Sequence, residues 1–306
     1  MEAITILMPT YNKELYIDQA ICSVLIQKTQ YKFKLIVIDD KSTDNSLMIA
    51  KQYQKKYPNI ISIIEKEKNE GCLSTIIKGY ENTNTDYFCV LDPDDYWINK
   101  SVIENAISYL EQHNDYTMYV SNTYCDQDGK LMPYFDYEQE MDFDFDSLSE
   151  MKWGHTSGTI FRNVIFKSGV PKALYHQVGG RYEASFRGDS FRNIIHLQKG
   201  KAHFVTEMTS VYRIIPCGIW TRHSQFQRNV LNADFFLRMF HYFDKIKPEY
   251  FIIACWRFCK SNLELIYGHS DNSFNIQDEN VFLTRFNEVL WECLRYLDLS
   301  TGHTIK

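Results

Sequence analysis

Asp92, Asp94 and Asp95 place three carboxylates within four residues, directly after the apolar run at 87–91. Carboxylates packed at the end of a buried strand repel one another and are costly to desolvate unless a cation or a ligand compensates. Mg²⁺ is commonly held by one or two carboxylates together with substrate phosphates. The segment therefore predicts a site at which a metal ion, held by these carboxylates, binds a diphosphate. The alternative is a solvated turn, since Pro and Asp also favour turns.

A second acidic pair, Asp39 and Asp40, ends the apolar run at 33–38 and precedes helix-capping residues at 42–44. One interpretation is an acidic turn that caps the next helix. Another is the acid that binds a ribose hydroxyl in a dinucleotide fold, which requires a glycine-rich turn after the first strand. The turn at 9–13 has the sequence PTYNK and contains no glycine. A nicotinamide or flavin fold is therefore disfavoured, and the chain also lacks a GxxxxGK[ST] phosphate loop and a GxSxG nucleophile elbow.

Alternating strand and helix signals position these polar segments. Apolar runs predict four strands and helical spacing predicts three helices, the strands at 4–8, 33–38, 60–64 and 87–91 and the helices at 17–25, 46–57 and 73–80. Such alternation predicts an α/β fold, with a mostly parallel central sheet and helices on both faces. Ligands bind beyond the carboxyl ends of such strands, so we expect the segments after the first, second and fourth strands to meet in one crevice.

The remainder of the chain changes character twice. The acidic, aromatic segment at 136–150 predicts an irregular loop, and a helix at 190–198 is followed by short strands at 204–205 and 211–215. Beyond about residue 220, helical spacing of apolar residues continues to the end. We therefore expect a catalytic domain over 1–220 and a C-terminal helical region over 221–306.

Composition limits the partners. The net charge of the 306 residues is −6, which disfavours nucleic-acid binding because phosphate neutralisation supplies most of that affinity. The eight cysteines form no CxxC pair, so we expect reduced thiols and a cytoplasmic location. We expect no signal peptide, and the apolar run at 250–259 is roughly half the ~20 residues of a membrane span. Peripheral contact with the inner face of the membrane stays open.

In their order and spacing, several motifs resemble glycosyltransferase family 2. They are PTYN at 9–12, VIDD at 37–40 followed by STD, NEG at 69–71, LDPDD at 91–95, and, as in a bacterial glycan-type subgroup, HTS at 155–157, GD at 188–189, VYR at 211–213 and GIW at 218–220. The resemblance covers about residues 3–222 and implies a GT-A fold that transfers a sugar from a nucleotide-diphosphate donor with inversion.

The resemblance also implies roles for individual residues. It implies a divalent metal, Mn²⁺ or Mg²⁺, at Asp94 and a general base at Asp189, which takes the proton of the acceptor hydroxyl. The residues that it implies for binding the donor and its nucleotide are Pro9, Thr10, Tyr11, Asp39 or Asp40, Asn69, Gly71, Asp92, Asp95 and Arg213. Three further residues are candidates for the acceptor side or a covering loop: His155, Trp220 and His223.

Two departures from the family pattern concern the donor site. The Arg and Asn usual in the helix after the Asn-x-Gly turn are Ile76 and Ile77 here, and a His usual two residues after Tyr-Arg is Ile215. These changes put one nucleotide contact and the metal environment in question, and His223 is a candidate substitute for the missing His.

The leading hypothesis is an inverting transferase that moves a hexose or N-acetylhexosamine, with UDP as the commonest nucleotide, to a glycan, lipid-linked or protein-linked acceptor. Two alternatives stay open: a nucleotidyltransferase that forms sugar nucleotides, and a non-catalytic scaffold that binds them. The C-terminal helices would shape acceptor access, form a homo-oligomer or touch a membrane.

Overall fold

The computed structural model describes residues 2–147, 154–179, 183, 187–215, 218, 220–243, 247–268 and 280–301. The chain divides into two compact units, one of Met1–Gly179 with Gly188–Ile214 and one of Gly180–Arg187 with Ile215–Lys306. The predicted domain boundary at residue 220 lies shortly after the end of the first unit.

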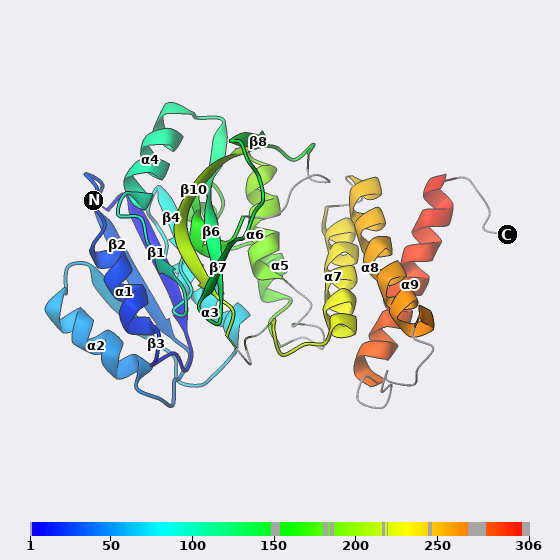
Figure 1. Cartoon of the computed structure of the whole chain (residues 1–306), viewed down its shortest axis with the longest axis horizontal. Coiled ribbons are helices and arrows are strands. Elements are labelled where there is room, and N and C mark those ends of the chain that lie inside the picture. Colours follow the sequence, from blue (N-terminus) through cyan, green and yellow to red (C-terminus); the bar gives the residue numbers. More distant parts are fainter. Residues whose placement is uncertain are drawn as a thin grey trace. The chain divides into compact units, whose positions relative to one another are not determined.

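The first unit begins with the predicted alternation of strands and helices (Figure 1). Its elements are β1 (Ile4–Thr10), α1 (Ile17–Leu25), β2 (Phe33–Asp39), α2 (Ser46–Lys56), β3 (Ile61–Glu65), α3 (Cys72–Glu81) and β4 (Tyr87–Val90). The strands pair in parallel in the order β3-β2-β1-β4. Parallel pairing places the carboxyl ends of β1, β2 and β4 at one edge of the sheet, where ligands of such folds bind.

Helices cover both faces of this sheet. Ile4, Ile6 and Met8 of β1 belong to a core cluster with residues of α1 and of α4 (Val102–Gln112). Leu7 points to the other face, because successive side chains of a strand alternate. There α3 packs closely on the strands, since a Cβ on Gly79 would lie 3.1 Å from Leu7 Cδ1. The apolar runs are thus buried on both faces, as expected for parallel strands.

The rest of the first unit extends the sheet as β9-β6-β10-β5, with β7 on β6 and β8 on β10. The strands are β5 (Tyr96–Trp97), β6 (Tyr116–Gln127), β7 (Lys130–Pro133), β8 (Met141–Phe143), β9 (Thr159–Arg162) and β10 (Lys201–Arg213), and the helices are η1 (Thr156–Gly158), η2 (Phe166–Ser168), α5 (Lys172–Tyr175) and α6 (Gly188–Leu197). β6 and β10 pair in parallel, whereas β9 and β5 run antiparallel to their neighbours.

Two local predictions were wrong. The strands predicted at 204–205 and 211–215 belong, as far as Arg213, to the single strand β10, whose register against β6 shifts between Val205 and Ser210. The loop predicted at 136–150 contains β8, which pairs with β10, and residues 148–150 lie outside the described part of the chain.

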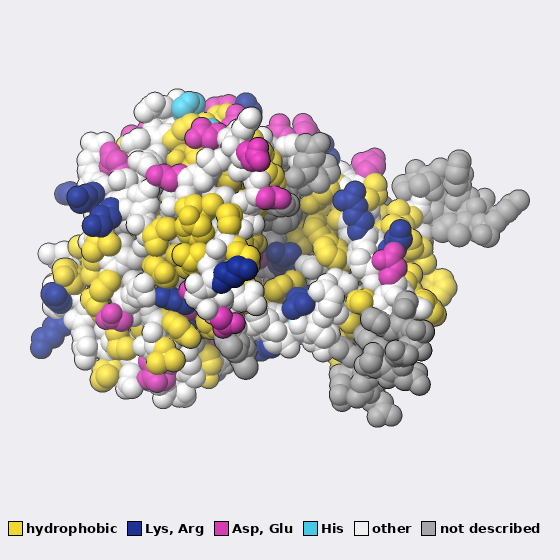
Figure 2. All heavy atoms as spheres, in the orientation of Figure 1, with side chains coloured by type: hydrophobic (Ala, Val, Ile, Leu, Met, Phe, Trp, Pro, Cys, Tyr) yellow, Lys and Arg dark blue, Asp and Glu magenta, His cyan; other side chains and the backbone are white. Residues whose placement is uncertain are grey.

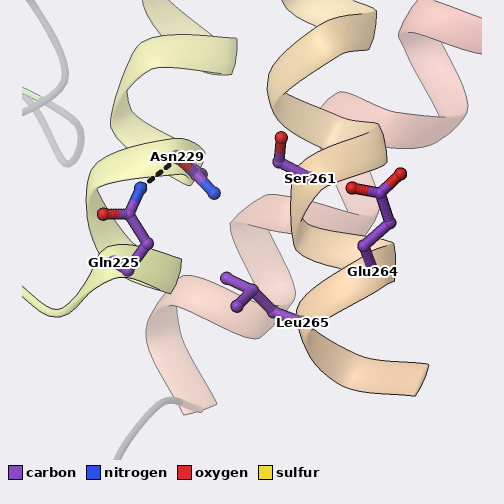
Figure 3. Close-up of a pocket in the computed structure, with 5 residues that line it drawn as sticks. All are labelled: Gln225, Asn229, Ser261, Glu264 and Leu265. Carbon is purple, nitrogen blue, oxygen red and sulfur yellow. Dashed lines mark hydrogen bonds between the residues drawn. The ribbon is translucent and has the colours of Figure 1, made fainter. Parts of the chain in front are cut away.

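The second unit packs α7 (Gln225–Tyr242), α8 (Pro248–Gly268) and α9 (Asn280–Thr301) together (Figure 1). Asp234 of α7 is fully buried and pairs with Arg238 and, across the helices, with Arg285 of α9. A pocket of about 330 Å³ opens between α7 and α8 beside Gln225 and Glu264 (Figure 3). Among the described residues, no helix combines the length and hydropathy of a membrane span.

Charged side chains of both signs are interspersed on the face drawn in Figure 2. Over the described residues of that face, Lys and Arg do not gather into one continuous basic surface of the kind that binds a nucleic-acid backbone.

Candidate active site

Carboxylates from three separate elements converge around Cys72, the first residue of α3. Its surface is exposed, yet the protein atoms crowded around the thiol raise its pKa to about 12. The next causes of that rise are the charges of Asp92, Asp189, Asp40 and Asp94, in this order. These charges place carboxylates from the ends of β2 and β4 and from the start of α6 near one exposed side chain, at the edge of the sheet where the crevice is expected.

The turn after β4 is stabilised from within and by β10. Asp95 N–H donates to Asp92 O at 2.9 Å, and Arg213 N–H donates to Asp95 Oδ1 at 3.1 Å. Burial, followed by the charge of Asp94, raises the pKa of the Asp92 carboxyl to about 7. Burial also raises the pKa of Asp95, whose Oδ2 has no hydrogen-bond partner among the described residues. The turn thus holds two carboxyls, those of Asp92 and Asp95, whose pKa is raised by burial.

Asp94 is partly exposed and pairs with a cation of this chain. Its side chain is 18% exposed, and Lys13 Nζ lies 2.7 Å from its Oδ2. Arg213 donates from Nη1 to the Asp94 backbone oxygen at 2.5 Å and also donates to Gln19. The guanidinium lies 4.4 Å from the centre of the Tyr96 ring, which supports it by a cation–π contact. Arg213 therefore positions the loop that presents Asp94.

The end of β1 approaches the same place. Pro9 pairs in register with β2, and Thr10 is buried, with its hydroxyl donating to Met8 O at 3.1 Å and its carbonyl accepting from Asp40 N–H at 2.8 Å. Tyr11 is 43% exposed. Of these three predicted donor-site residues, Tyr11 thus offers the most accessible side chain.

Asp39 and Asp40 differ in how their oxygens are used. Asp39 Oδ2 accepts Ser42 N–H at 3.1 Å, while its buried Oδ1 has no hydrogen-bond partner among the described residues. Asp40 engages both oxygens, with Lys66 Nζ at 2.8 Å from Oδ1 and Gly71 N–H at 2.8 Å from Oδ2. Of the two acids left open by the sequence, Asp39 is thus the one with an oxygen that no described group contacts, and its side chain is buried.

The turn before α3 is stabilised by its own residues. Asn69 Oδ1 accepts Gly71 N–H at 3.2 Å, and Gly71 has a φ of 88°, a conformation that glycine adopts without strain. Ile76 and Ile77, at the positions of the family's Arg and Asn, are 7% and 4% exposed and pack in the core. These two side chains therefore supply no polar contact to a nucleotide.

Asp189 is the second residue of α6, where the positive end of the helix dipole favours a carboxylate. Its charge acts on Cys72, on Asp92 and on His155, which places it beside the turn after β4. The structure thus brings together Asp40, Asp92, Asp94 and Asp189, four residues predicted from separate motifs.

His155 lies near these carboxylates but stays neutral. Burial lowers its pKa to about 4, although the charges of Asp189 and Asp94 act in the opposite direction. Its Nδ1 lies 2.7 Å from Ser157 Oγ, and its ring centre is 4.4 Å from that of Tyr212. The ring is thus neutral at pH 7 and is held by a hydroxyl and by a tilted contact with Tyr212, and its predicted place on the acceptor side remains a prediction.

The other predicted loop residues belong to the second unit. The Arg187 guanidinium lies 5.4 Å from the centre of the Trp220 ring, and His223 Nδ1 lies 3.1 Å from Gln227 Oε1. Ile215, also in this unit, accepts the Thr221 hydroxyl through its carbonyl at 2.9 Å. The predicted roles of Trp220 and His223 in the site remain predictions.

Two cations of the site were not predicted. Lys13 directly follows the PTYN motif, so its position in the sequence could have indicated that it lies near the site. Arg192 is 3% exposed, donates to the Tyr80 hydroxyl at 3.2 Å, and is the largest influence that lowers the pKa of Asp92. Its Nε and Nη2 have no hydrogen-bond partner within the described ranges. Its place in a helix otherwise rich in buried side chains gave no such signal.

Within the described ranges, no group of three or more His, Cys, Asp or Glu side chains is arranged to hold a metal by itself. A divalent ion at this crevice would therefore need further oxygen ligands, which a bound diphosphate can supply.

A family model described as glycosyl transferase family 2 matches residues 5–171, which include the ends of β1, β2 and β4. The chain belongs to glycosyl transferase family 2. The matched segment holds the motifs at 9–12, 37–40 and 69–71 and the Asp92–Asp95 turn, whereas Asp189 lies beyond it.

Curated relatives agree with this membership, and solved structures share the fold. The chain is 35% identical over 112 residues to the minor teichoic acid biosynthesis protein GgaB of Bacillus subtilis (36% of this chain, 12% of GgaB) and 37% identical over 111 residues to the dTDP-rhamnosyl transferase RfbG of Shigella flexneri (35% and 38%). It therefore spans less than two thirds of the length of these relatives. The S. aureus TarS 1–349 structure in complex with UDP-GlcNAc aligns with a TM-score of 0.68 over 97% of this chain and 81% of that one, at 14% identity. The α/β fold of the GT-A kind with C-terminal helices is thereby confirmed.

Proposed function

We propose that the chain is an inverting glycosyltransferase that moves a hexose or N-acetylhexosamine from a nucleotide-diphosphate sugar to an acceptor hydroxyl. The observation that carries this proposal is the convergence of Asp40, Asp92 and Asp94, which lie in the segment matched by the family 2 model, with Asp189 around Cys72. The bound ligands of two fold neighbours support a donor of this class: TarS with UDP-GlcNAc, and the Pyrobaculum calidifontis mannosyltransferase PcManGT with GDP-Man and Mn²⁺ (TM-score 0.54, 11% identity, 96% of this chain and 87% of that one).

In this proposal each carboxylate has its own task. Asp39 would accept a hydrogen bond from the nucleotide through its unpartnered Oδ1. Asp189 would accept the proton of the acceptor hydroxyl while that oxygen bonds to the anomeric carbon of the donor. The bond from the same carbon to the diphosphate breaks on the opposite side, so the configuration inverts. The acceptor would be a hydroxyl of a glycan, lipid-linked or protein-linked molecule.

A divalent ion fits the residues present. The Asp94 carboxylate already accepts an ammonium at 2.7 Å, and Asp92 adds a second carboxylate close by, the oxygen ligands that Mn²⁺ or Mg²⁺ takes together with phosphates. Bound there, the ion would offset the charge of the leaving diphosphate. Arg213 would keep the loop of Asp94 in place and add positive charge near the phosphates.

A panel of UDP-, GDP- and dTDP-sugars with Mn²⁺ tests the proposal through binding and release of nucleoside diphosphate. We expect one donor to bind and hydrolyse slowly, and Asp94→Ala to abolish both. Asp86→Ala is the matched control, because Asp86 is 71% exposed and pairs with Lys167. Release of pyrophosphate from a nucleoside triphosphate would instead favour a nucleotidyltransferase, and binding without turnover would favour a scaffold.

A further inference from the structure

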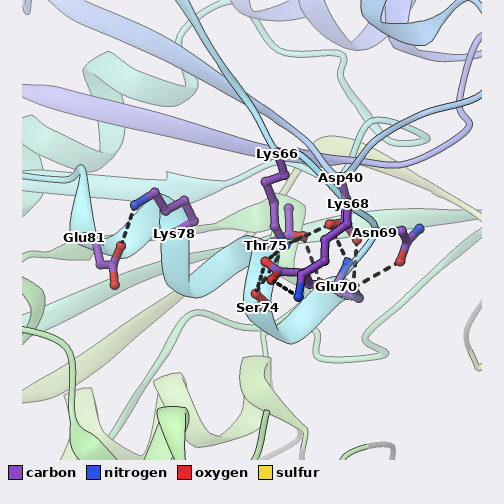
Figure 4. Close-up of polar contacts among 10 residues, drawn as sticks. Asp40, Lys66, Lys68, Asn69, Glu70, Ser74, Thr75, Lys78 and Glu81 are labelled. Atoms are coloured by element: carbon purple, nitrogen blue, oxygen red, sulfur yellow. Dashed lines mark hydrogen bonds and ion pairs between the residues drawn. The ribbon is translucent and has the colours of Figure 1, made fainter. Parts of the chain in front are cut away.

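Lys66 is a nearly buried cation at the end of β3. Its side chain is 8% exposed, and its Nζ lies 2.8 Å from Asp40 Oδ1 and 3.1 Å from Glu70 Oε2. The ammonium also donates to the hydroxyls of Ser74 at 3.2 Å and Thr75 at 3.1 Å (Figure 4). Burying an ammonium is costly unless it is paired and hydrogen-bonded. Lys66 meets this condition only while the turn before α3 keeps its present conformation.

Asp40 joins this turn to the sheet. Its Oδ1 accepts Glu70 N–H at 3.0 Å, its Oδ2 accepts Gly71 N–H at 2.8 Å, and Lys66 neutralises its charge. Figure 4 shows these contacts gathered at one point, where β2, β3 and the start of α3 meet. The same backbone segment contains Asp39, whose buried Oδ1 has no hydrogen-bond partner among the described residues.

The turn at 69–71 thus lies between two parts of the candidate site. On one side is the end of β2 with Asp39, and on the other is Cys72, next to Asp92 and Asp189. The positions where the family carries an Arg and an Asn are Ile76 and Ile77, both buried. The positive charge at this end of α3 therefore comes from β3 and not from the helix.

We propose that Lys66 is a positioning residue for donor binding, which acts through Asp40 by holding the turn at 69–71 against the nucleotide end of β2. This inference rests on the proposed function. Lys66 would not touch the donor, because its ammonium is already surrounded by Asp40, Glu70, Ser74 and Thr75. Its loss would leave a buried carboxylate without its cation and release the turn.

Lys66→Met tests the proposal, with Lys78→Met as the control, since Lys78 lies on α3, is 49% exposed and pairs with Glu81 at 3.1 Å (Figure 4). We expect Lys66→Met to raise the donor Kd and KM at least tenfold, with kcat at saturating donor within about threefold of the wild type. Lys66→Arg should recover part of the affinity, and Lys78→Met should change neither constant. A purely structural role would lower the melting temperature without this split between KM and kcat.

Hydrogen exchange adds a readout that needs no donor. In Lys66→Met, the amides of Glu70 and Gly71 should exchange faster, while the amides of β6 keep the wild-type rate. If Lys66→Met does not fold, Lys66→Gln takes its place and should give the same two results. Wild-type KM and unchanged exchange in the folded variant would overturn the inference. Failure of the wild-type chain to bind any nucleotide sugar would overturn the proposed function itself.

Discussion

Lys13 Nζ lies 2.7 Å from Asp94 Oδ2, so the carboxylate proposed to bind a metal already holds a cation of this chain. The two residues are 81 positions apart, and the contact joins the turn after β1 to the turn after β4. Both side chains are partly exposed, at 22% and 18%, so a ligand entering the crevice can reach them.

Lys13→Met should therefore tighten the binding of Mn²⁺ in the absence of donor. The substitution removes a positive charge that competes with the ion for Asp94. A partly exposed ion pair is worth up to about 1 kcal/mol, so we expect a gain of up to about fivefold. Calorimetric titration with Mn²⁺ measures it, and Lys51→Met, which removes the exposed pair of Lys51 with Glu65, is the control. Unchanged or weaker Mn²⁺ binding in Lys13→Met would contradict the competition.

Asp39→Asn should weaken donor binding without unfolding the protein. The amide oxygen of Asn can still accept the Ser42 N–H. The amide NH₂ then takes the place of the unpartnered oxygen, and the negative charge of the carboxylate is lost. A hydrogen bond to a charged group is worth about 1.5–3 kcal/mol, so we expect the donor Kd to rise at least tenfold. Calorimetric titration with the nucleotide diphosphate that the wild type binds measures the affinity, and a thermal melt shows whether the variant stays folded. A donor Kd equal to that of the wild type would exclude Asp39 from the nucleotide site.

We expect the buried His196 to make the stability of the first unit depend on pH. The ring is fully buried, its Nδ1 lies 2.7 Å from Arg192 O, and burial lowers its pKa to about 3. The unfolded chain, with a pKa of about 6.5, takes up the proton first as the pH falls. The free energy of unfolding therefore has its full value, as far as His196 is concerned, above about pH 6.5. It falls as the pH drops towards 3, and the loss at pH 4.5 is about 3 kcal/mol.

Chemical denaturation between pH 7.5 and 4.5 measures this slope. His196→Gln should be less stable at neutral pH, since it disturbs the core, but its stability should fall less steeply with decreasing pH. The exposed His176 supplies the control, and His176→Gln should keep the slope of the wild type. An unchanged slope in His196→Gln would show that His196 is not the group responsible.

The first part of the fold was predictable because its signals are local. Short apolar runs buried on both faces mark β1, β2 and β4, and amphipathic spacing marks α1, so the strand ends and their polar residues followed directly. β6 has no counterpart among the predicted elements. Its buried Ser121 and Thr123 hydrogen-bond to Thr209 and Ser210 of β10, which are more than 80 residues away. Because these buried side chains are polar, the strand lacks the apolar run that would have predicted it.

The site was predictable as a set of motifs but not in its internal contacts. The sequence left Asp39 and Asp40 equivalent, because the groups that distinguish them come from Ser42 and from the distant Lys66 and Gly71. Arg192 reaches Asp92 only through the packing of α6 against the sheet. Long-range pairs of this type depend on tertiary structure, which residue spacing does not encode.

Asp189→Asn, compared with the wild type in parallel assays of donor binding and sugar transfer, tests the central claim most directly. The substitution keeps the shape of the side chain but removes the base, and a positioned base contributes about 10²–10⁴-fold to such reactions. We predict a donor Kd within about threefold of the wild type and a loss of transfer of at least about a hundredfold. Asp86→Asn should leave both unchanged. Full transfer activity in Asp189→Asn would contradict the account.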